Sequence, residues 1–260
     1  MGHRVFQYCI SMRSITIGNG LTSMGEYVLS GCHKLESITV GEGNTAYKSV
    51  DGNLYTLDGK TLLQYAIGKN DEFFAIPDGV ENILPYAFSS SKFTSVSIPD
   101  SVESIGNYAF YNCTSLKGIT LPNKVKSIGS YAFAGASALT KIAIPQSVTT
   151  IGKNAFAATG LHSIIIPEGV AVIEYSTFYN CKSLNSIVLP STITSIGDRA
   201  FDYCYELKEI HCKATTPPTL EMFSLLNNIS GRKIYVPHGS VEAYKTAENW
   251  SNFAEQIYGE

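Results

Sequence analysis

Apolar positions recur along the chain with a period of 22 or 23 residues, far longer than the period of one helix or strand. The most regular block reads I-G-x-x-A-F and begins at Ile105, Ile128, Ile151 and Ile196. Its phenylalanine, here called the anchor, recurs at Phe88, Phe110, Phe133, Phe156, Phe178 and Phe201, and Phe6 and Leu29 occupy the same slot earlier. A fixed period of this length indicates a stacked repeat architecture. We therefore expect the anchors to form one continuous internal spine.

A second block, L-x-x-I-x-I-P, follows the anchors, as from Leu116 to Pro122 and from Leu139 to Pro145. Its alternation predicts a short strand with two side chains inward and one outward. Proline ends the strand because it has no backbone N–H to donate. The A-F-x-x-C stretch is too short for a full helix and predicts a single helical turn. The glycine after the later isoleucine, such as Gly129 after Ile128, is expected to permit a tight turn.

Two segments depart from the repeat. Residues 41–73 contain Asp51-Gly52 and Asp58-Gly59, each flanked by strand-like runs. Asp-Gly favours a two-residue hairpin because glycine tolerates a positive φ. We predict a three-stranded meander over residues 48–50, 53–57 and 61–65. The spacing of its oxygen-bearing side chains does not fit a calcium loop.

The C-terminal segment, residues 213–260, is expected to cap a solenoid that spans residues 1–212. Leu220, Phe223 and Leu226 suggest a short helix, and residues 234–236 suggest one more repeat strand. Val241, Tyr244 and Trp250 would lie on one helical face. A solenoid needs a cap over its last coil, so we expect Trp250 to cover the end of the spine.

The I-G-x-x-A-F-x-x-C-x-x-L-x-x-I-x-I-P spacing covers nearly the whole chain and resembles the BspA-like leucine-rich repeats of bacterial cell-surface proteins. The resemblance implies a leucine-rich-repeat solenoid, a right-handed β/α superhelix that is mainly β with short helical turns. The β-meander insert and an α/β C-terminal cap complete the expected fold. It also implies a secreted or cell-surface location and contacts with proteins of a host or a neighbouring cell.

Composition excludes several classes of partner. Charged residues are 16% of the 260 residues, the net charge is −3, and there is no run of one sign. A nucleic-acid surface normally needs a basic stripe, so no nucleic-acid partner is expected. No apolar run approaches the ~20 residues of a membrane helix, so we expect no membrane insertion by this segment. The first twenty residues lack the layout of a signal peptide, and we interpret the chain as a mature fragment.

The cysteines and histidines do not indicate catalysis or metal binding. Five of the six cysteines lie three residues after an anchor, as Cys113 follows Phe110, and Cys212 occupies an inward strand position. We therefore predict free thiols in the core, although Cys9 with Cys32, and Cys181 with Cys204, could be neighbours within disulfide range. Nothing resembles a nucleophile, base and oxyanion arrangement. We expect neither a cofactor nor enzymatic activity.

Two exposed rows are candidate binding surfaces. The first, here called the strand face, contains the middle outward residue of each strand: Thr16, Thr39, Ala75, Ser97, Thr120, Ala143, Ile165, Val188, His211 and Tyr235. The second, here called the tyrosine row, lies two residues before the anchors: Tyr27, Tyr86, Tyr108 and Tyr131. Extended sheet faces of solenoids commonly bind partners, and tyrosines are enriched in recognition surfaces. Each row also has a purely structural interpretation, as solvated strand residues or as a stabilising ring ladder.

The leading functional hypothesis is an extracellular protein–protein interaction or adhesion module without catalytic activity. The alternative is a surface module that binds glycans for nutrient capture, in which the tyrosine row would contact the sugar. The first hypothesis depends on the resemblance, because a fold alone does not define a function.

Overall fold

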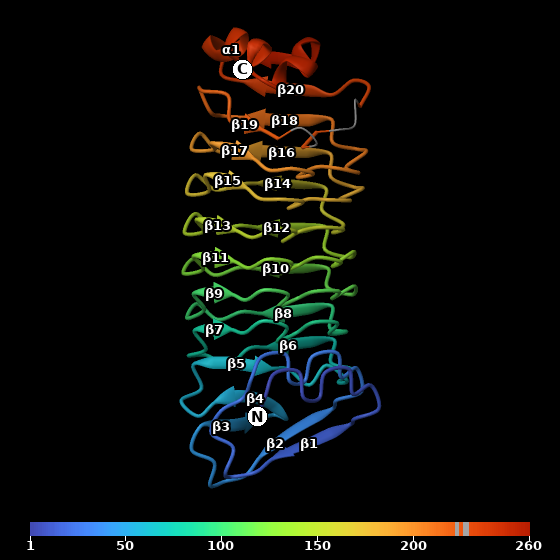
Figure 1. Cartoon of the computed structure of the whole chain (residues 1–260), viewed down its shortest axis with the longest axis vertical. Helices are drawn as coiled ribbons and strands as arrows, with labels where there is room; N and C mark the ends of the chain where they lie inside the picture. The colour runs from blue at the N-terminus through green and yellow to red at the C-terminus, as the bar shows by residue number, and fades with distance from the viewer. Residues whose placement is uncertain (222–223, 226–228) are drawn as a thin grey trace.

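The computed structural model describes residues 1–221, 224–225 and 229–260. Figure 1 shows a tall stack of coils that rises from the N-terminal strands to the C-terminal helices. The chain forms a β-solenoid of about 10 turns, which confirms the predicted fold class. Each regular coil contributes one strand to a first ladder, one strand to a second ladder and one anchor turn.

The elements follow one another in coil order. The first ladder contains β1 (Ser14–Ile17), β2 (Ser37–Val40), β6 (Phe73–Ala75), β8 (Ser95–Ser97), β10 (Gly118–Thr120), β12 (Lys141–Ala143), β14 (Ser163–Ile165), β16 (Ser186–Leu189), β18 (Glu209–Cys212) and β20 (Lys233–Val236). The second ladder contains β7 (Asn82–Ile83), β9 (Ser104–Ile105), β11 (Ser127–Ile128), β13 (Thr150–Ile151), β15 (Val172–Ile173), β17 (Ser195–Ile196) and β19 (Thr219–Leu220). The insert adds β3 (Tyr47–Val50), β4 (Asn53–Thr56) and β5 (Thr61–Gln64), and the C-terminal segment adds η1 (His238–Ser240), α1 (Val241–Thr246), η2 (Trp250–Gln256) and β21 (Ile257–Gly259).

Within each sheet, the ladder strands pair in parallel with their counterparts one repeat away; the first ladder is divided between β2 and β6 and between β12 and β14, and the second between β13 and β15. Ile119 of β10 lies beside Ile142 of β12, and Ile128 of β11 lies beside Ile151 of β13. The anchor turns form a third set of bonds between coils, because the Phe110 N–H donates to the Ala132 carbonyl at 2.7 Å. Equivalent repeat positions therefore fall on top of one another on every side of the coil.

This register stacks the anchor rings. The six rings from Phe88 to Phe201 are buried, with consecutive centroids 5.0–5.6 Å apart and ring planes within 10° of parallel. Tyr65 precedes them in the same position, since its N–H donates to the Ala87 carbonyl and its ring lies 5.5 Å from Phe88. The spine thus begins one coil earlier than the phenylalanine pattern indicates.

The expected continuity of the spine to the N-terminus is wrong. Leu29 is buried in a separate core with Ile17 and Leu54, and Phe6 is only partly buried against it. The insert causes the break, because β3 and β4 run antiparallel and occupy the space where a regular coil would stack on β2. In Figure 1, β1 and β2 are accordingly tilted away from the strands above them.

The insert itself folds as predicted. Strands β3, β4 and β5 form an antiparallel meander, and Asp51 and Gly52 both adopt positive φ, 48° and 71°, in the first hairpin. The Asp58 carboxylate accepts a hydrogen bond from the Thr56 hydroxyl at 2.6 Å and closes the second turn. The meander does not leave the solenoid, however. β5 pairs in parallel with β7, so its last strand also belongs to the second ladder.

The anchor segments are pairs of tight turns and not a single helical turn. Residues on both sides of an anchor adopt left-handed φ, as at Tyr108 (57°) and Asn112 (53°) around Phe110. This conformation reverses the chain direction while the intervening amides point toward the next coil. It is unfavourable for a residue with a Cβ, by about 1–2 kcal/mol, so the bonds and packing between coils must offset it.

Close stacking also explains the glycine of the I-G pair. A Cβ on Gly129 would lie 2.5 Å from the backbone nitrogen of Asn107 in the previous coil, and one on Gly152 would lie 2.5 Å from the Ser130 nitrogen. Neither glycine has a positive φ. Glycine is therefore needed at these positions because two backbones approach closely, and not because of the tight turn that the sequence predicted.

All six cysteines are thiols, five of them buried and Cys9 partly buried. Their thiols also donate hydrogen bonds between coils. The Cys113 Sγ–H donates to the Phe88 carbonyl at 3.1 Å, and Cys181 and Cys204 do the same to Phe156 and Phe178 at 3.0 Å. The thiols are thus buried, as expected, but they are also specific donors.

The C-terminal segment closes the upper end of the main core. β20 continues the first ladder, and β21 pairs with it. Trp250 is buried, its Nε1–H donates to the Pro218 carbonyl at 2.7 Å, and its ring lies 5.0 Å from Tyr244. Val241 and Tyr244 belong to α1, whereas Trp250 follows a left-handed kink at Asn249, so the three do not share one helix.

The sequence predicted a short helix from Leu220, Phe223 and Leu226. This prediction is wrong for Leu220. Leu220 lies in strand β19, which pairs with β17. Phe223 and Leu226 lie outside the described residues. A repeat strand is therefore retained after Pro217 and Pro218, where the sequence pattern appeared to break.

Truncation of a central anchor tests the spine. Replacing Phe133 with Ala removes a fully buried ring between two stacked neighbours and should lower the free energy of unfolding by about 3–5 kcal/mol. Urea denaturation measures the change. Lys141→Ala, an exposed substitution in the following strand, should stay within about 0.5 kcal/mol of wild type. A loss below about 1 kcal/mol at Phe133 would contradict the role of the spine.

Burial of the Cys113 thiol predicts a decline in stability at alkaline pH. Burial raises the pKa of Cys113 from about 9 to about 12. Above pH 9 the unfolded chain loses this proton and the folded chain keeps it, so stability falls as the pH rises from about 9 to about 12. The slope due to one thiol is at most about 1.4 kcal/mol per pH unit. Urea unfolding between pH 8.5 and 10.5 should show a shallower decline for Cys113→Ser, and equal slopes for both proteins would refute the assignment.

Candidate functional site

The strand face points outward, with Val188, His211 and Tyr235 only partly exposed, and the structure divides its residues among three sheets. Thr16 and Thr39 lie on the separate two-stranded sheet β1–β2, where their hydroxyls are 3.3 Å apart. Ala75, Ser97, Thr120 and Ala143 lie on the sheet β6–β8–β10–β12, and Ile165, Val188, His211 and Tyr235 lie on β14–β16–β18–β20. The insert interrupts the predicted row between β2 and β6, whereas β12 and β14 remain adjacent although they belong to different sheets.

The C-terminal section differs from the other two in chemistry. Register places Ile165 beside Val188, Val188 beside His211, His211 beside Tyr235, and Tyr235 beside Tyr258 of β21. We call these five side chains the apolar strip. Ile165 is 63% exposed and Tyr258 is 46% exposed, although both have large apolar side chains. These residues belong to the sheet β14-β16-β18-β20-β21, whose strands β14, β16, β18 and β20 lie one above another in the upper part of the stack in Figure 1.

Ring contacts order the aromatic end of the strip. The His211 and Tyr235 rings are stacked at 4.7 Å, with an angle of 19° between their planes, and Tyr258 lies 6.2 Å beyond Tyr235. The His211 Nδ1 is 2.8 Å from a carboxylate oxygen of Glu260. These contacts leave His211 and Tyr235 partly buried, between the more exposed Ile165 and Tyr258.

Polar side chains border the apolar strip. The neighbouring outward positions on β14, β16, β18 and β20 are Ser163, Ser186, Glu209 and Lys233. An apolar centre beside a polar rim is the usual arrangement of a protein–protein contact surface. The central section of the strand face, with Ser97, Thr120 and Ala143, has no comparable apolar centre.

The tyrosine row is assembled as predicted, but its ring faces are already used. Tyr86 and Tyr108 stack at 4.5 Å, Tyr108 and Tyr131 stack at 4.6 Å, and Tyr27 meets Tyr86 edge-on at 4.9 Å. Burial is the main cause that raises the pKa of Tyr27, Tyr86 and Tyr108, and neighbouring groups add to the shift. A sugar ring stacks on the face of an aromatic side chain, and in Tyr108 both faces are covered by other tyrosines. The geometry favours the stabilising role of this row.

Sequence reasoning missed several exposed aromatic residues. Tyr258 extends the apolar strip because β21 adds a strand after the last repeat, which no repeat pattern indicates. Tyr203 and Tyr205, whose rings meet edge-on at 6.0 Å, follow the anchor Phe201 and are both exposed. Their spacing from the anchors differs from that of the tyrosine row, so a search for one repeated slot does not find them.

Other chemistry is sparse in the part of the chain that the structure describes. It contains no cluster of three or more His, Cys, Asp or Glu side chains able to hold a metal ion. Within the same ranges, no helix has the length and apolar character needed to cross a membrane. Burial raises the pKa of Cys113, which opposes formation of a nucleophilic thiolate there.

These features define a repeat protein of the leucine-rich solenoid class, with exposed sheet faces and turn surfaces. The sequence model of the BspA type leucine rich repeat region matches the chain in six copies, over residues 1–51, 68–185 and 171–247. The chain belongs to this family. Neither the family nor its structural neighbours indicate a catalytic function.

Solved structures of bacterial repeat proteins are similar to the chain. A leucine rich cell surface protein from Faecalibacterium prausnitzii A2-165 is 31% identical, with a TM-score of 0.58, and the match covers 78% of this chain and 48% of that one. A leucine-rich repeat protein from Eubacterium ventriosum is 24% identical, with a TM-score of 0.61 and coverages of 85% and 63%. The pneumococcal vaccine antigen PcpA is 22% identical, with a TM-score of 0.58 and coverages of 95% and 54%.

The last two likenesses concern the fold alone. The chain spans about half to two thirds of the length of these three proteins. A search of curated proteins gave no significant match.

A double-mutant cycle tests whether the tyrosine row stabilises the stack. Tyr108→Ala and Tyr131→Ala should each destabilise the fold, and their stacked rings should give a coupling energy of about 0.5–1.5 kcal/mol. Chemical denaturation of the two single variants and the double variant measures it. The distant pair Tyr108 and Tyr203 serves as the additive control. A coupling no larger than that of the control pair would show that the row does not stabilise the coils.

Proposed function

We propose that this chain is an extracellular protein-binding module and that the apolar strip is its contact surface. The observation that supports the proposal most strongly is the change in the strand face from hydroxyl and methyl side chains to Ile165, Val188 and an aromatic run. Outward strand positions are not constrained by core packing, so the informative feature is that large apolar side chains follow one another there, beginning with Ile165, which is 63% exposed. Contiguous exposed apolar side chains commonly mark interaction sites.

The shape of the strip favours a protein partner. It is a flat surface across five strands, whereas small-molecule sites are concave and enclose most of their ligand. The polar rim of Glu209 and Lys233 offers both charge signs to a partner surface. The cell-surface description of the Faecalibacterium prausnitzii relative supports an extracellular location. A partner would be a protein of a host or a neighbouring cell.

Binding to purified proteins tests the proposal. The immobilised chain is assayed by surface plasmon resonance against a panel of extracellular-matrix and serum proteins. For any protein that binds, Ile165→Ser should weaken the affinity by about tenfold, because it removes the apolar group most exposed on the strip. Ala143→Ser, on the neighbouring strand β12, is the matched control and should leave the affinity unchanged. The proposal is wrong if Ile165→Ser binds every such partner as tightly as wild type.

A further inference from the structure

A hollow lies where the first coils meet the insert, far from the apolar strip. Its volume is about 180 Å³, and its walls come from the loop before Leu29, from β4 and β5 of the meander, and from the turn after β7. Met24, Leu54, Leu63 and Leu84 supply most of the apolar wall. The hollow exists because the separate N-terminal core and the main core do not share one spine.

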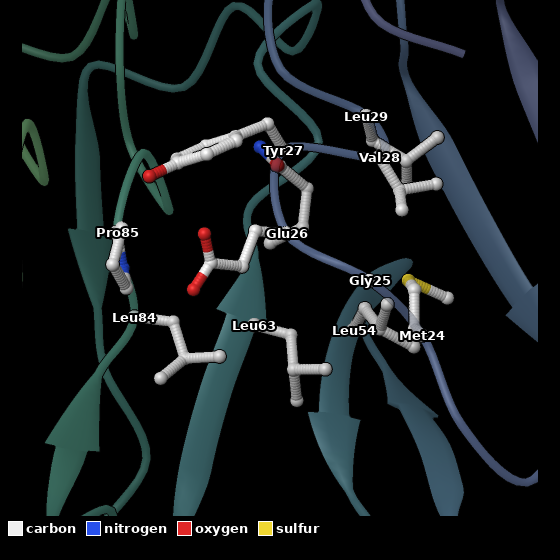
Figure 2. A pocket seen from close by; sticks show the side chains of 11 residues that line it. Met24, Gly25, Glu26, Tyr27, Val28, Leu29, Leu54, Leu63, Leu84 and Pro85 are labelled. Carbon is white, nitrogen blue, oxygen red and sulfur yellow. The ribbon is translucent and has the colours of Figure 1, made fainter. Parts of the chain in front are cut away.

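One carboxylate faces this apolar space. Figure 2 shows the Glu26 side chain pointing between Tyr27, Leu63 and Leu84. Glu26 is a solvent-exposed residue whose carboxylate forms a side-chain hydrogen bond with Tyr27, and the nearby Arg4 guanidinium lies over the Tyr27 ring, 5.4 Å from its centroid. His3 also lies nearby, and its Nδ1 accepts the Glu26 backbone N–H at 3.1 Å. The lining therefore carries one solvent-accessible carboxylate, hydrogen-bonded to Tyr27, beside an apolar wall.

We propose that this hollow receives the side chain of a lysine presented by a partner protein. The lysine methylenes would lie against Met24, Leu63 and Leu84, and the ammonium would meet the Glu26 carboxylate. The match is one of charge and of shape, since a lysine has an apolar stem and a compact charged end. Arginine fits less well, because its planar guanidinium needs a wider opening and several acceptors. The inference rests on the proposed function only for the source of the lysine, since the site itself is separate from the strip.

Small probes test the site directly on the full chain. Nuclear magnetic resonance follows the methyl signals of Met24, Leu54, Leu63 and Leu84 during titration with Nα-acetyl-lysine amide. Two control probes are titrated in the same way. Nα-acetyl-norleucine amide has a side chain of similar length without a charge, and Nα-acetyl-arginine amide carries a different cation. The lysine probe should bind at least about fivefold more tightly than either, because only it combines the apolar stem with a compact charge. In a series of simple amines, n-butylammonium should bind more tightly than ethylammonium, by about fourfold for each added methylene.

Two charge variants distinguish a specific effect of the Glu26 carboxylate on binding from a general effect of the net charge of the molecule. Glu26→Gln should weaken binding of the lysine probe about fivefold and remove its preference over norleucine. Glu42→Gln makes the same change at an exposed residue outside the hollow and should bind as wild type does. Leu84→Trp, which fills the hollow while retaining Glu26, should abolish the methyl shifts, with thermal unfolding confirming that it is folded.

Several outcomes would overturn the proposal. These are equal binding of the lysine and norleucine probes, tighter binding of the arginine probe, no effect of Glu26→Gln, and unchanged shifts in Leu84→Trp. Ile165→Ser must leave all of these titrations unchanged, because the apolar strip does not contribute to the hollow. Failure of the strip and failure of the hollow are therefore distinguishable.

Discussion

The fold depends on the in-register hydrogen bonding between coils. Backbone amides on the strands and on the anchor turns bond to the coil above or below, so each repeat position lies directly over its counterpart. Identical side chains must then pack against one another, which is why the anchors form a column of nearly parallel rings. The same spacing excludes a Cβ at Gly129 and lets the Cys113 thiol reach a carbonyl of the preceding anchor. No single coil could bury its apolar side alone.

This constraint also shapes the surfaces. Because every slot is repeated, the exterior consists of rows, and the chemistry of a row can change only by substitution from one coil to the next. In the tyrosine row, the repeated rings cover one another and add to the stability of the stack. In the apolar strip, side chains of different shapes follow one another, and Ile165 and Tyr258 retain large exposed areas. Repetition thus supports stability, and departure from repetition leaves side chains available to a partner.

The insert also shows how a departure from the repeat changes the packing between coils. Its antiparallel strands prevent β2 from stacking on the next regular coil, and the N-terminal core forms separately from the main core. Tyr27, from the N-terminal coils, and Tyr86, from the main stack, meet edge-on. Incomplete packing beside this contact leaves the hollow that contains Glu26. Both proposed binding sites therefore lie where the regular pattern changes, one at each end of the stack.

The sequence by itself determined the repeat, the anchor positions from Phe88 to Phe201, the hairpin strands of the insert and the exposure of the strand face. These follow from local spacing, because a period of 22 or 23 residues and an alternation within each strand leave few ways to bury the apolar side chains. Only the tertiary structure decided that Tyr65 begins the spine, that Leu29 belongs to a second core, and that the strand face divides into sections. It also decided that Tyr258 joins the apolar strip and that Glu26 faces a hollow. These results depend on contacts between segments far apart in the chain, whose relative placement no local pattern specifies.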